Sequence, residues 1–248
     1  MQQNDSRVAD LVAAGEIRVG LFLPQYALDA GSGGLKGIGT GLLAIALTEI
    51  VAARLGIRAR VVQYPAPNAA IAGLKNNTSD VVYLGIAPSR ATEVDFAPAV
   101  FQFDYSLLLP PGSPITSVAD ADRQGVRIGI VEGHASALTL RGIVKHAQLV
   151  GAELPEQTFD LLKQDKVDAL AFPRDHVLDF ASRLPNSRVL AKGYGINRVG
   201  IAVRKGRPGL LAYCSEFSKE ALDSGAVQSI IDRGPLPGFE PATTDEAG

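Results

Sequence analysis

Hydrophobic and polar positions along this chain follow two alternating periods, one typical of buried strands and one typical of helices. Short apolar runs rich in β-branched residues predict strands at residues 16–23, 57–64 and 79–86. Between the first two strands, apolar residues recur at helical spacing: Leu43, Leu47, Ile50, Val51 and Leu55. Gly56 follows the last of them, and a glycine there is typical of a helix end.

The remaining segments continue the same alternation. A short helix is predicted between the second and third strands, with Asn68 as its N-cap. The order then restarts with a strand, a helix and a strand at residues 125–133, 134–151 and 167–172. Extended runs within residues 187–206 and two helices within residues 208–234 follow.

The order strand–helix–strand–helix–strand therefore occurs twice, which predicts a mainly parallel α/β fold in two lobes. Crossing segments near residues 101–109 and 193–203 join the lobes. We predict lobe 1 over residues 1–103 plus 200–248 and lobe 2 over residues 104–199. Because strand carboxyl ends in such sheets face a crevice, we expect the ligand site in the interlobe cleft.

Composition and charge exclude several functions. Of the 248 residues, 46% are apolar, and the formal net charge of −2 argues against a nucleic-acid binder. A single cysteine, Cys214, permits neither an internal disulfide nor a thiolate-rich metal site. The three histidines are not at ligand spacing, so we predict no structural metal and no cofactor.

The N-terminal residues lack the charged-then-apolar pattern of a secretory signal. The pattern fits either a cytosolic protein or a mature chain whose signal has been replaced by a start methionine. No apolar run approaches the roughly 20 residues that a membrane helix needs.

The order of segments resembles that of the type 2 periplasmic solute-binding proteins, in particular family 3, the polar amino-acid binders of ABC transporters. The segments that carry the resemblance are SDVVYLGIAPSRATEVDFAPAV, YSLLLPPGSPITSVADADRQGVRIGIVEGHAS and VGIAVRKGRPGLLAYCSEFSKEALDSGAVQSII. The resemblance implies a two-lobed periplasmic-binding-protein-like fold of type II, closed on its ligand by a hinge motion. It also implies a small carboxylate-bearing ligand, an ABC transporter permease as partner and a periplasmic location. We expect a monomer.

Arg90 matches the family arginine that holds the α-carboxylate of the ligand. A planar guanidinium suits this role because it donates two parallel hydrogen bonds to a carboxylate. The alternative is a surface arginine paired with Glu93 or Asp95. Gly85 and Ala87 match family positions that bind the ligand amine or carboxylate.

Further candidates follow the predicted strands at residues 16–23 and 125–133. Phe22 and Tyr26 lie where the family often places an aromatic ring over the ligand, although Phe22 also suits the core. The segment His134–Ala135–Ser136 begins a predicted helix, whose free backbone N–H groups suit a carboxylate. Ser136 either binds ligand or caps the helix, and His134 either reaches the ligand or is a solvated loop residue.

The family aspartate that neutralises a ligand ammonium is expected directly after the strand at residues 167–172, where this chain has Pro173-Arg174-Asp175. Asp175 supplies that charge two residues later, or Arg174 replaces it. Since a buried ammonium without a counter-charge is costly, a carboxylate without an amine, or a ligand with two acidic groups, fits Arg90 plus Arg174 better.

The same fold serves receptor ligand-sensing domains and cyclohexadienyl dehydratases, so fold alone does not decide function. A dehydratase requires an acid or a base in the cleft, and the candidates are Glu132, His134, Asp175 and His176. No nucleophile–histidine–aspartate order or phosphate-binding loop is present. We predict a binding protein and not an enzyme.

Overall fold

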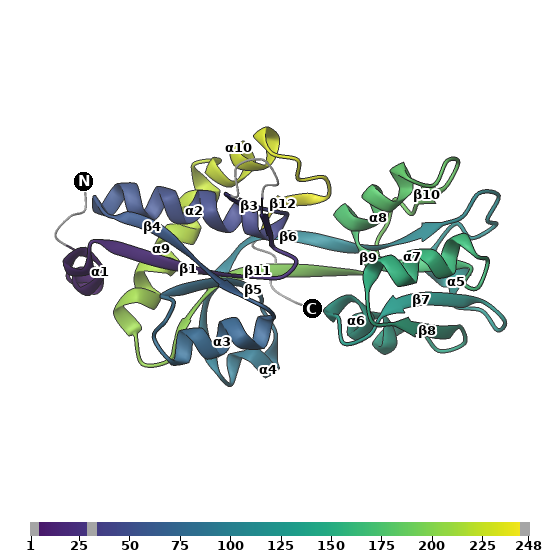
Figure 1. The fold of residues 1–248 in the computed structure, drawn as a ribbon, viewed down its shortest axis with the longest axis horizontal. Helices are drawn as coiled ribbons and strands as arrows, with labels where there is room; N and C mark the ends of the chain where they lie inside the picture. The colour runs from purple at the N-terminus through teal and green to yellow at the C-terminus, as the bar shows by residue number, and fades with distance from the viewer. Residues whose placement is uncertain (1–4, 29–33, 244–248) are drawn as a thin grey trace. The chain divides into compact units, whose positions relative to one another are not determined.

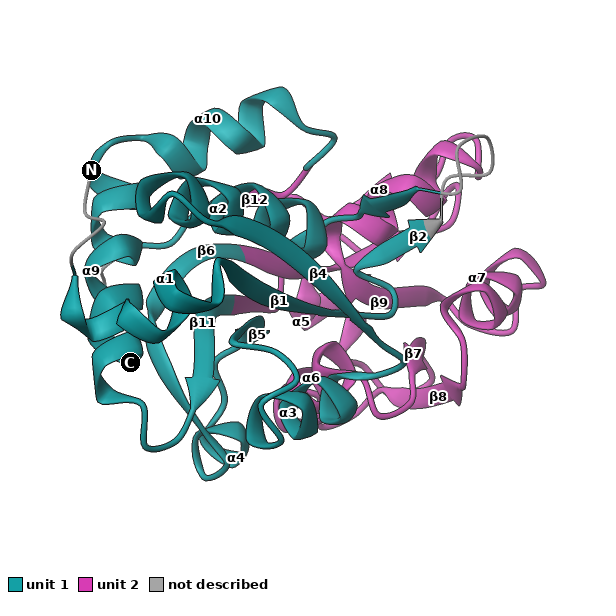
Figure 2. Cartoon of the chain, turned by 60° about the vertical axis from the view of Figure 1, so that its left-hand side comes forward, with its two compact units in different colours: residues 1–102, 198–236, 240–248 teal, residues 103–197, 237–239 magenta. Residues whose placement is uncertain are grey.

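The computed structural model describes residues 5–28 and 34–243, and Figure 1 labels its elements. The chain divides into two compact units (Figure 2). Unit 1 comprises residues 1–102, 198–236 and 240–248, and unit 2 comprises residues 103–197 and 237–239. The chain passes between the units within two long strands, β6 (Val94–Leu109) and β11 (Gly195–Arg204), and again around residues 237–239.

Unit 1 is built on a mixed sheet in the order β4-β1-β5-β11-β6. Strand β1 (Glu16–Phe22) is parallel to β4 (Arg58–Tyr64) and β5 (Val81–Gly85), whereas β11 is antiparallel to β5. The other short strands are β2 (Tyr26–Leu28), β3 (Leu35–Gly37) and β12 (Phe239–Pro241). Its helices are η1 (Ser6–Val8), α1 (Ala9–Ala14), α2 (Thr40–Leu55), α3 (Pro67–Lys75), α4 (Pro88–Ala91), α9 (Pro208–Asp223) and α10 (Ala226–Arg233).

Two helix boundaries of unit 1 show how local sequence sets the elements. Helix α2 ends as predicted, because Gly56 adopts φ 70° in the left-handed region and closes the last turn. The prediction that Asn68 caps α3 is wrong. The helix begins two residues earlier, at Pro67, with Ala66 as the N-cap. Proline suits the first helical position because its missing N–H would have had no partner there.

Unit 2, like unit 1, has a central strand with a parallel neighbour on each side. Its sheet runs β6-β9-β7-β8, and β7 (Arg127–Val131) is parallel to both β8 (Gln148–Ala152) and β9 (Ala169–Pro173). The short strand β10 (Arg188–Val189) pairs with β6. The helices are α5 (Val118–Ala121), α6 (Ala135–Ile143), α7 (Pro155–Lys163) and α8 (Arg174–Ser182).

The predicted helix at residues 134–151 is too long. Helix α6 ends at Ile143, Val144 is extended, and strand β8 begins at Gln148. Strand β8 pairs with all five residues of β7, from Arg127 with Gln148 to Val131 with Ala152. Pairing with a distant strand therefore outweighs the local helical pattern.

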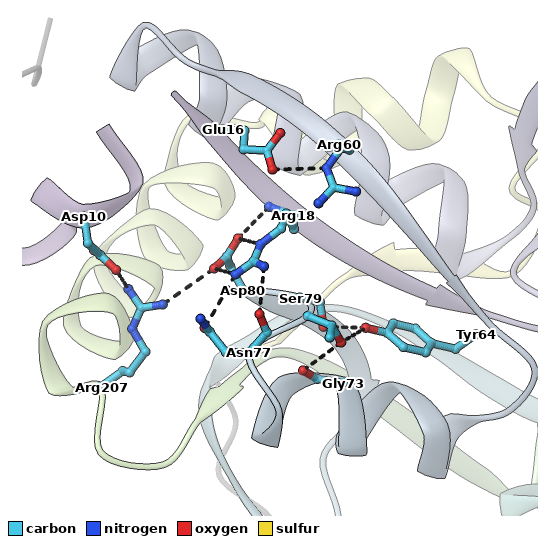
Figure 3. Close-up of polar contacts among 11 residues, drawn as sticks. Asp10, Glu16, Arg18, Arg60, Tyr64, Gly73, Asn77, Ser79, Asp80 and Arg207 are labelled. Atoms are coloured by element: carbon cyan, nitrogen blue, oxygen red, sulfur yellow. Dashed lines mark hydrogen bonds and ion pairs between the residues drawn. The ribbon is translucent and has the colours of Figure 1, made fainter. Parts of the chain in front are cut away.

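One buried ion pair fastens the amino-terminal ends of β1 and β5 in unit 1 (Figure 3). Asp80 accepts hydrogen bonds from the backbone N–H and from Nε of Arg18, at 2.8 and 2.9 Å. Its second oxygen accepts from Arg18 Nη2 at 2.8 Å and lies 3.6 Å from Nη1 of Arg207. Only 3% of the Asp80 side chain is exposed. This contact sets the strand register at the opposite end from the predicted site.

Candidate functional site

The predicted site residues collect at the carboxyl ends of the parallel strands within each unit. In unit 1, strands β1, β4 and β5 run in one direction, so the segments that follow β1 and β5 share one edge of the sheet. In unit 2, the same holds for the segments that follow β7 and β9. Such edges are where open α/β sheets bind ligands.

Arg90 in unit 1 is held against the end of strand β5. It lies on the short helix α4, and its Nη1 donates a 2.9 Å hydrogen bond to the carbonyl of Gly85. The side chain is partly exposed, as are Gly85 and Ala87, the N-cap of α4. The backbone thus orients the Arg90 guanidinium at the carboxyl end of β5.

The two carboxylates that were the alternative partners of Arg90 bond lysines. Glu93 Oε2 lies 2.9 Å from Lys75 Nζ, and Asp95 Oδ1 lies 3.3 Å from Lys205 Nζ. These pairs neutralise both acids locally.

The aromatic candidates of unit 1 lie beside the end of β1. Phe22 packs partly against the buried cluster of Val82, Leu84 and their neighbours, so the structure places it at the margin of the core. The hydroxyl of Tyr26 donates to the backbone carbonyl of Tyr64, the last residue of β4, at 3.3 Å. Both rings therefore belong to the same edge of the sheet as Arg90.

In unit 2, the start of helix α6 brings His134 and Ser136 together. His134 is the N-cap, and its Nδ1 accepts a 3.1 Å hydrogen bond from the backbone N–H of Ser136 and lies 2.7 Å from Oγ of Ser136. The cap is therefore the histidine and not the serine, which is fully buried. The His134 ring packs on Phe172 at 4.7 Å between centroids, so it is not a solvated loop residue.

Arg174 in unit 2 is held by an acidic side chain and by two backbone carbonyls. Its Nε and Nη2 donate to the carboxylate of Asp104 at 2.6 and 2.5 Å. The carbonyls of Leu190 and Ala191 accept two more hydrogen bonds, at 3.0 and 2.9 Å. Because this charge is neutralised within unit 2, Arg174 lies outside the set that we propose contacts a solute.

Asp175 bonds its neighbour on the first turn of α8. Its Oδ1 lies 2.9 Å from Nδ1 of His176, and 15% of its side chain is exposed. Burial of the imidazole opposes protonation, yet the Asp175 carboxylate outweighs it, and the net result is a raised pKa of His176. The His176 ring meets the Phe172 ring edge-on at 5.0 Å. The Asp175 carboxylate thus contacts a histidine. Strand β9 ends at Pro173, which has no carboxylate.

Glu132, a predicted acid or base, also forms an ion pair. Both of its oxygens accept from Nη2 of Arg141, at 2.9 and 2.8 Å, and both side chains are about half exposed.

One residue of the binding edge escaped the sequence analysis. Arg198 lies on β11, and its backbone carbonyl accepts a 2.8 Å hydrogen bond from the N–H of Ile86, directly after β5. Sequence alone places Arg198 in an extended run. Its position beside Ile86 depends on the pairing register of β11 with β5, which no local pattern specifies.

The described part of the chain offers no membrane-spanning helix, since none of its helices combines sufficient length with sufficient apolarity. Among the same residues, no group of three or more histidine, cysteine or acidic side chains is arranged to hold a metal ion.

Comparisons with known proteins identify a family and a fold. A sequence profile described as bacterial extracellular solute-binding proteins, family 3, matches residues 25–233. The ABC transporter glutamine-binding protein GlnH of Bacillus subtilis (strain 168) is 28% identical over 162 residues, which are 64% of this chain. The match covers 59% of GlnH, so the chain spans less than two thirds of that relative's length.

Two solved structures show the same fold. A putative binding component of an ABC transporter from Wolinella succinogenes, complexed with lysine, has a TM-score of 0.74 at 21% identity, covering 88% of this chain and 95% of that one. The solute receptor for L-cysteine of Neisseria gonorrhoeae has a TM-score of 0.69 at 24% identity, covering 93% and 94%. The predicted α/β fold of the type II periplasmic binding proteins is confirmed.

Proposed function

The chain belongs to the bacterial extracellular solute-binding proteins, family 3, and from this premise we propose that it binds a small carboxylate-bearing solute. The solute is an amino acid or a related organic acid, bound outside the cytoplasm for delivery to an ABC transporter permease. The observation that carries the proposal is Arg90, fixed to the Gly85 carbonyl at the binding edge of unit 1.

The chemistry of this edge supports carboxylate binding. Arg90 offers N–H groups in a fixed plane, and a charge-assisted pair with a carboxylate is stronger than a neutral hydrogen bond. Leu23 and Ile86 follow strands β1 and β5 and are 50% and 43% exposed, so they offer apolar surface that favours the carbon body of a solute. His134 and Ala135 of unit 2 stay predicted solute contacts.

A thermal-shift screen across amino acids and simple organic acids tests the proposal. Wild-type protein is expected to be stabilised by at least one of these acids, since a ligand that binds only the folded state raises the unfolding temperature. Arg90→Ala is expected to lower affinity at least about tenfold, because it removes a charge-assisted pair. The matched control is Arg58→Ala, whose side chain is 84% exposed at the opposite end of β4.

An Arg90→Ala protein that keeps wild-type affinity would contradict the role of Arg90. Stabilisation by no acid in the screen would count against the proposed function as a whole. Chemical turnover of the bound solute, followed by mass spectrometry, would favour an enzyme instead.

Hinge closure stays a prediction of the family resemblance. The chain crosses between units at residues 102–103 and 197–198, inside β6 and β11. If these are hinge segments, adding a bound solute will reduce the radius of gyration measured by small-angle scattering. An unchanged radius at saturating solute would contradict closure.

A further inference from the structure

Arg198 carries a buried donor without a partner. Its Nε has no hydrogen-bond partner in the described part of the chain, although the atom is shielded from solvent. Other shielded arginines in the same part are paired: Arg18 with Asp80, Arg174 with Asp104, and Arg207 with Asp10. A buried polar group without a partner is costly, and it is commonly explained by a ligand or a functional role.

The position of Arg198 is next to the proposed carboxylate subsite and within the same unit. Strand β11 is antiparallel to β5, with Val199 opposite Gly85, so Arg198 lies opposite Ile86. Opposite residues in an antiparallel pair project to the same face of the sheet, so Arg198 projects on the side of Ile86. The Gly85 carbonyl, one residue away, is the group that holds Arg90.

The two acidic side chains that follow Arg90 most closely are already neutralised. Glu93 and Asp95 follow Arg90 closely in the chain, and each bonds a lysine. Within residues 5–28 and 34–243, Nε of Arg198 has no hydrogen-bond partner, acidic or otherwise. A second anionic group on the solute would supply the missing partner of Nε.

We propose that Arg198 binds a second carboxylate of the solute, which makes small dicarboxylates the ligand class. Arg90 holds one carboxylate and Arg198 the other. The inference rests on the proposed function, because it concerns the same edge of unit 1. Acidic amino acids and amine-free dicarboxylic acids share this chemistry, and the experiment separates them. Since Asp175 bonds His176 and Pro173 ends β9, we expect the amine-free acids to bind at least as tightly.

Isothermal titration calorimetry with four probes tests the assignment. Succinate and glutarate carry two carboxylates, L-glutamate adds an amine, and L-glutamine replaces one carboxylate by a neutral amide. Wild-type protein is expected to bind at least one dicarboxylate about tenfold more tightly than L-glutamine. In Arg198→Gln this preference disappears, while any affinity for L-glutamine stays within about threefold of wild type.

The matched control is Arg204→Gln, an exposed arginine at the far end of the same strand, which is expected to keep the preference. Thermal unfolding without ligand checks the fold. Arg198→Gln is expected to unfold no earlier than wild type, because it removes a buried donor that lacks a partner.

The outcomes separate the two proposals. A wild-type protein that binds L-glutamine as tightly as every dicarboxylate overturns the dicarboxylate class and leaves the proposed function standing. Arg198→Gln with an intact preference overturns the role of Arg198. A wild-type protein that binds none of the four probes but another mono-acid overturns the class, whereas failure to bind any acid overturns the proposed function too.

Discussion

Units 1 and 2 each have an arginine–aspartate ion pair near the start of their central strands, but the two pairs are buried to different extents. In unit 1, Arg18 Nη2 lies 2.8 Å from Asp80, and in unit 2, Arg127 Nη2 lies 2.8 Å from Asp168. In both units the arginine backbone N–H also donates to the carboxylate at 2.8 Å. The Asp80 side chain is 3% exposed, whereas that of Asp168 is 38% exposed. The two ion pairs therefore have equal distances but unequal exposure to solvent. Comparing them separates the effect of burial on ion-pair strength from the effect of distance.

The surroundings of the two pairs differ in a second respect. Asp80 also lies 3.6 Å from Arg207, which bonds Asp10 and so links the ion pair of unit 1 to the N-terminal helix α1. Asp168 contacts Arg127 alone among the ion pairs recorded within the described residues. Unit 1 thus has a network of ion pairs, whereas unit 2 has a single pair. Removing one member of a buried network is strongly destabilising, because the remaining charges are left buried without a partner.

The largest expected effect is at Asp80. Asp80→Asn leaves two shielded arginines without their shared carboxylate and is expected to cost about 3 kcal/mol of the free energy of unfolding. Urea denaturation followed by circular dichroism measures it. A loss no larger than that of the matching change in unit 2 would refute the importance of burial.

Asp168→Asn is the matched change in unit 2, and its effect is expected to be smaller. Solvent screens this pair, so the expected loss in the free energy of unfolding is at most about 1 kcal/mol. The same denaturation experiment reports it. Unfolding in two separate transitions would assign each loss to its own unit, which would sharpen the comparison.

The smallest expected effect is the pH dependence of the Asp168 contribution. The hydrogen bond from Arg127 lowers the pKa of Asp168 below its ordinary value of 3.8, against the opposing effect of burial. A lowered carboxyl pKa stabilises the fold above the ordinary value and stops doing so as pH falls through the lowered one. The stability gap between wild type and Asp168→Asn is therefore expected to shrink below about pH 4. A gap that widens in acid would contradict the role of the ionised carboxylate.

Much of the fold could be predicted from periodicity, and the failures have a common cause. Strand β1 and helix α2 carry their own signals, an apolar β-branched run and a stripe that ends at Gly56. Strand β8 carries no such signal, because Gln148–Ala152 continues the apolar pattern of the helix before it. Only its pairing with β7 identifies it as a strand. Information held in a distant partner is absent from any local window.

The candidate site divides in the same way. The position of Arg90 after β5 could be predicted, because a residue that follows a predicted strand lies at the edge where that strand ends. The ion pair of Arg174 could not be predicted, because its partner Asp104 lies 70 residues away on another strand. Arg198 was missed for the complementary reason, since its importance lies in a missing partner and in the register of β11. Charge on a side chain is evident from sequence, but its neutralisation is not.

The hydrogen bonds of Arg174 hold the two ends of the stretch 103–197 close to each other. They tie Asp104, at the entry of the stretch 103–197, to Leu190 and Ala191 near its exit. A backbone hydrogen bond from Tyr194 to Tyr105 at 2.9 Å adds to the closure. Both ends of the stretch are thus held together by contacts inside the unit itself. A segment with neighbouring ends is the kind that a host domain accepts as an insertion, and such a module is also suited to circular permutation.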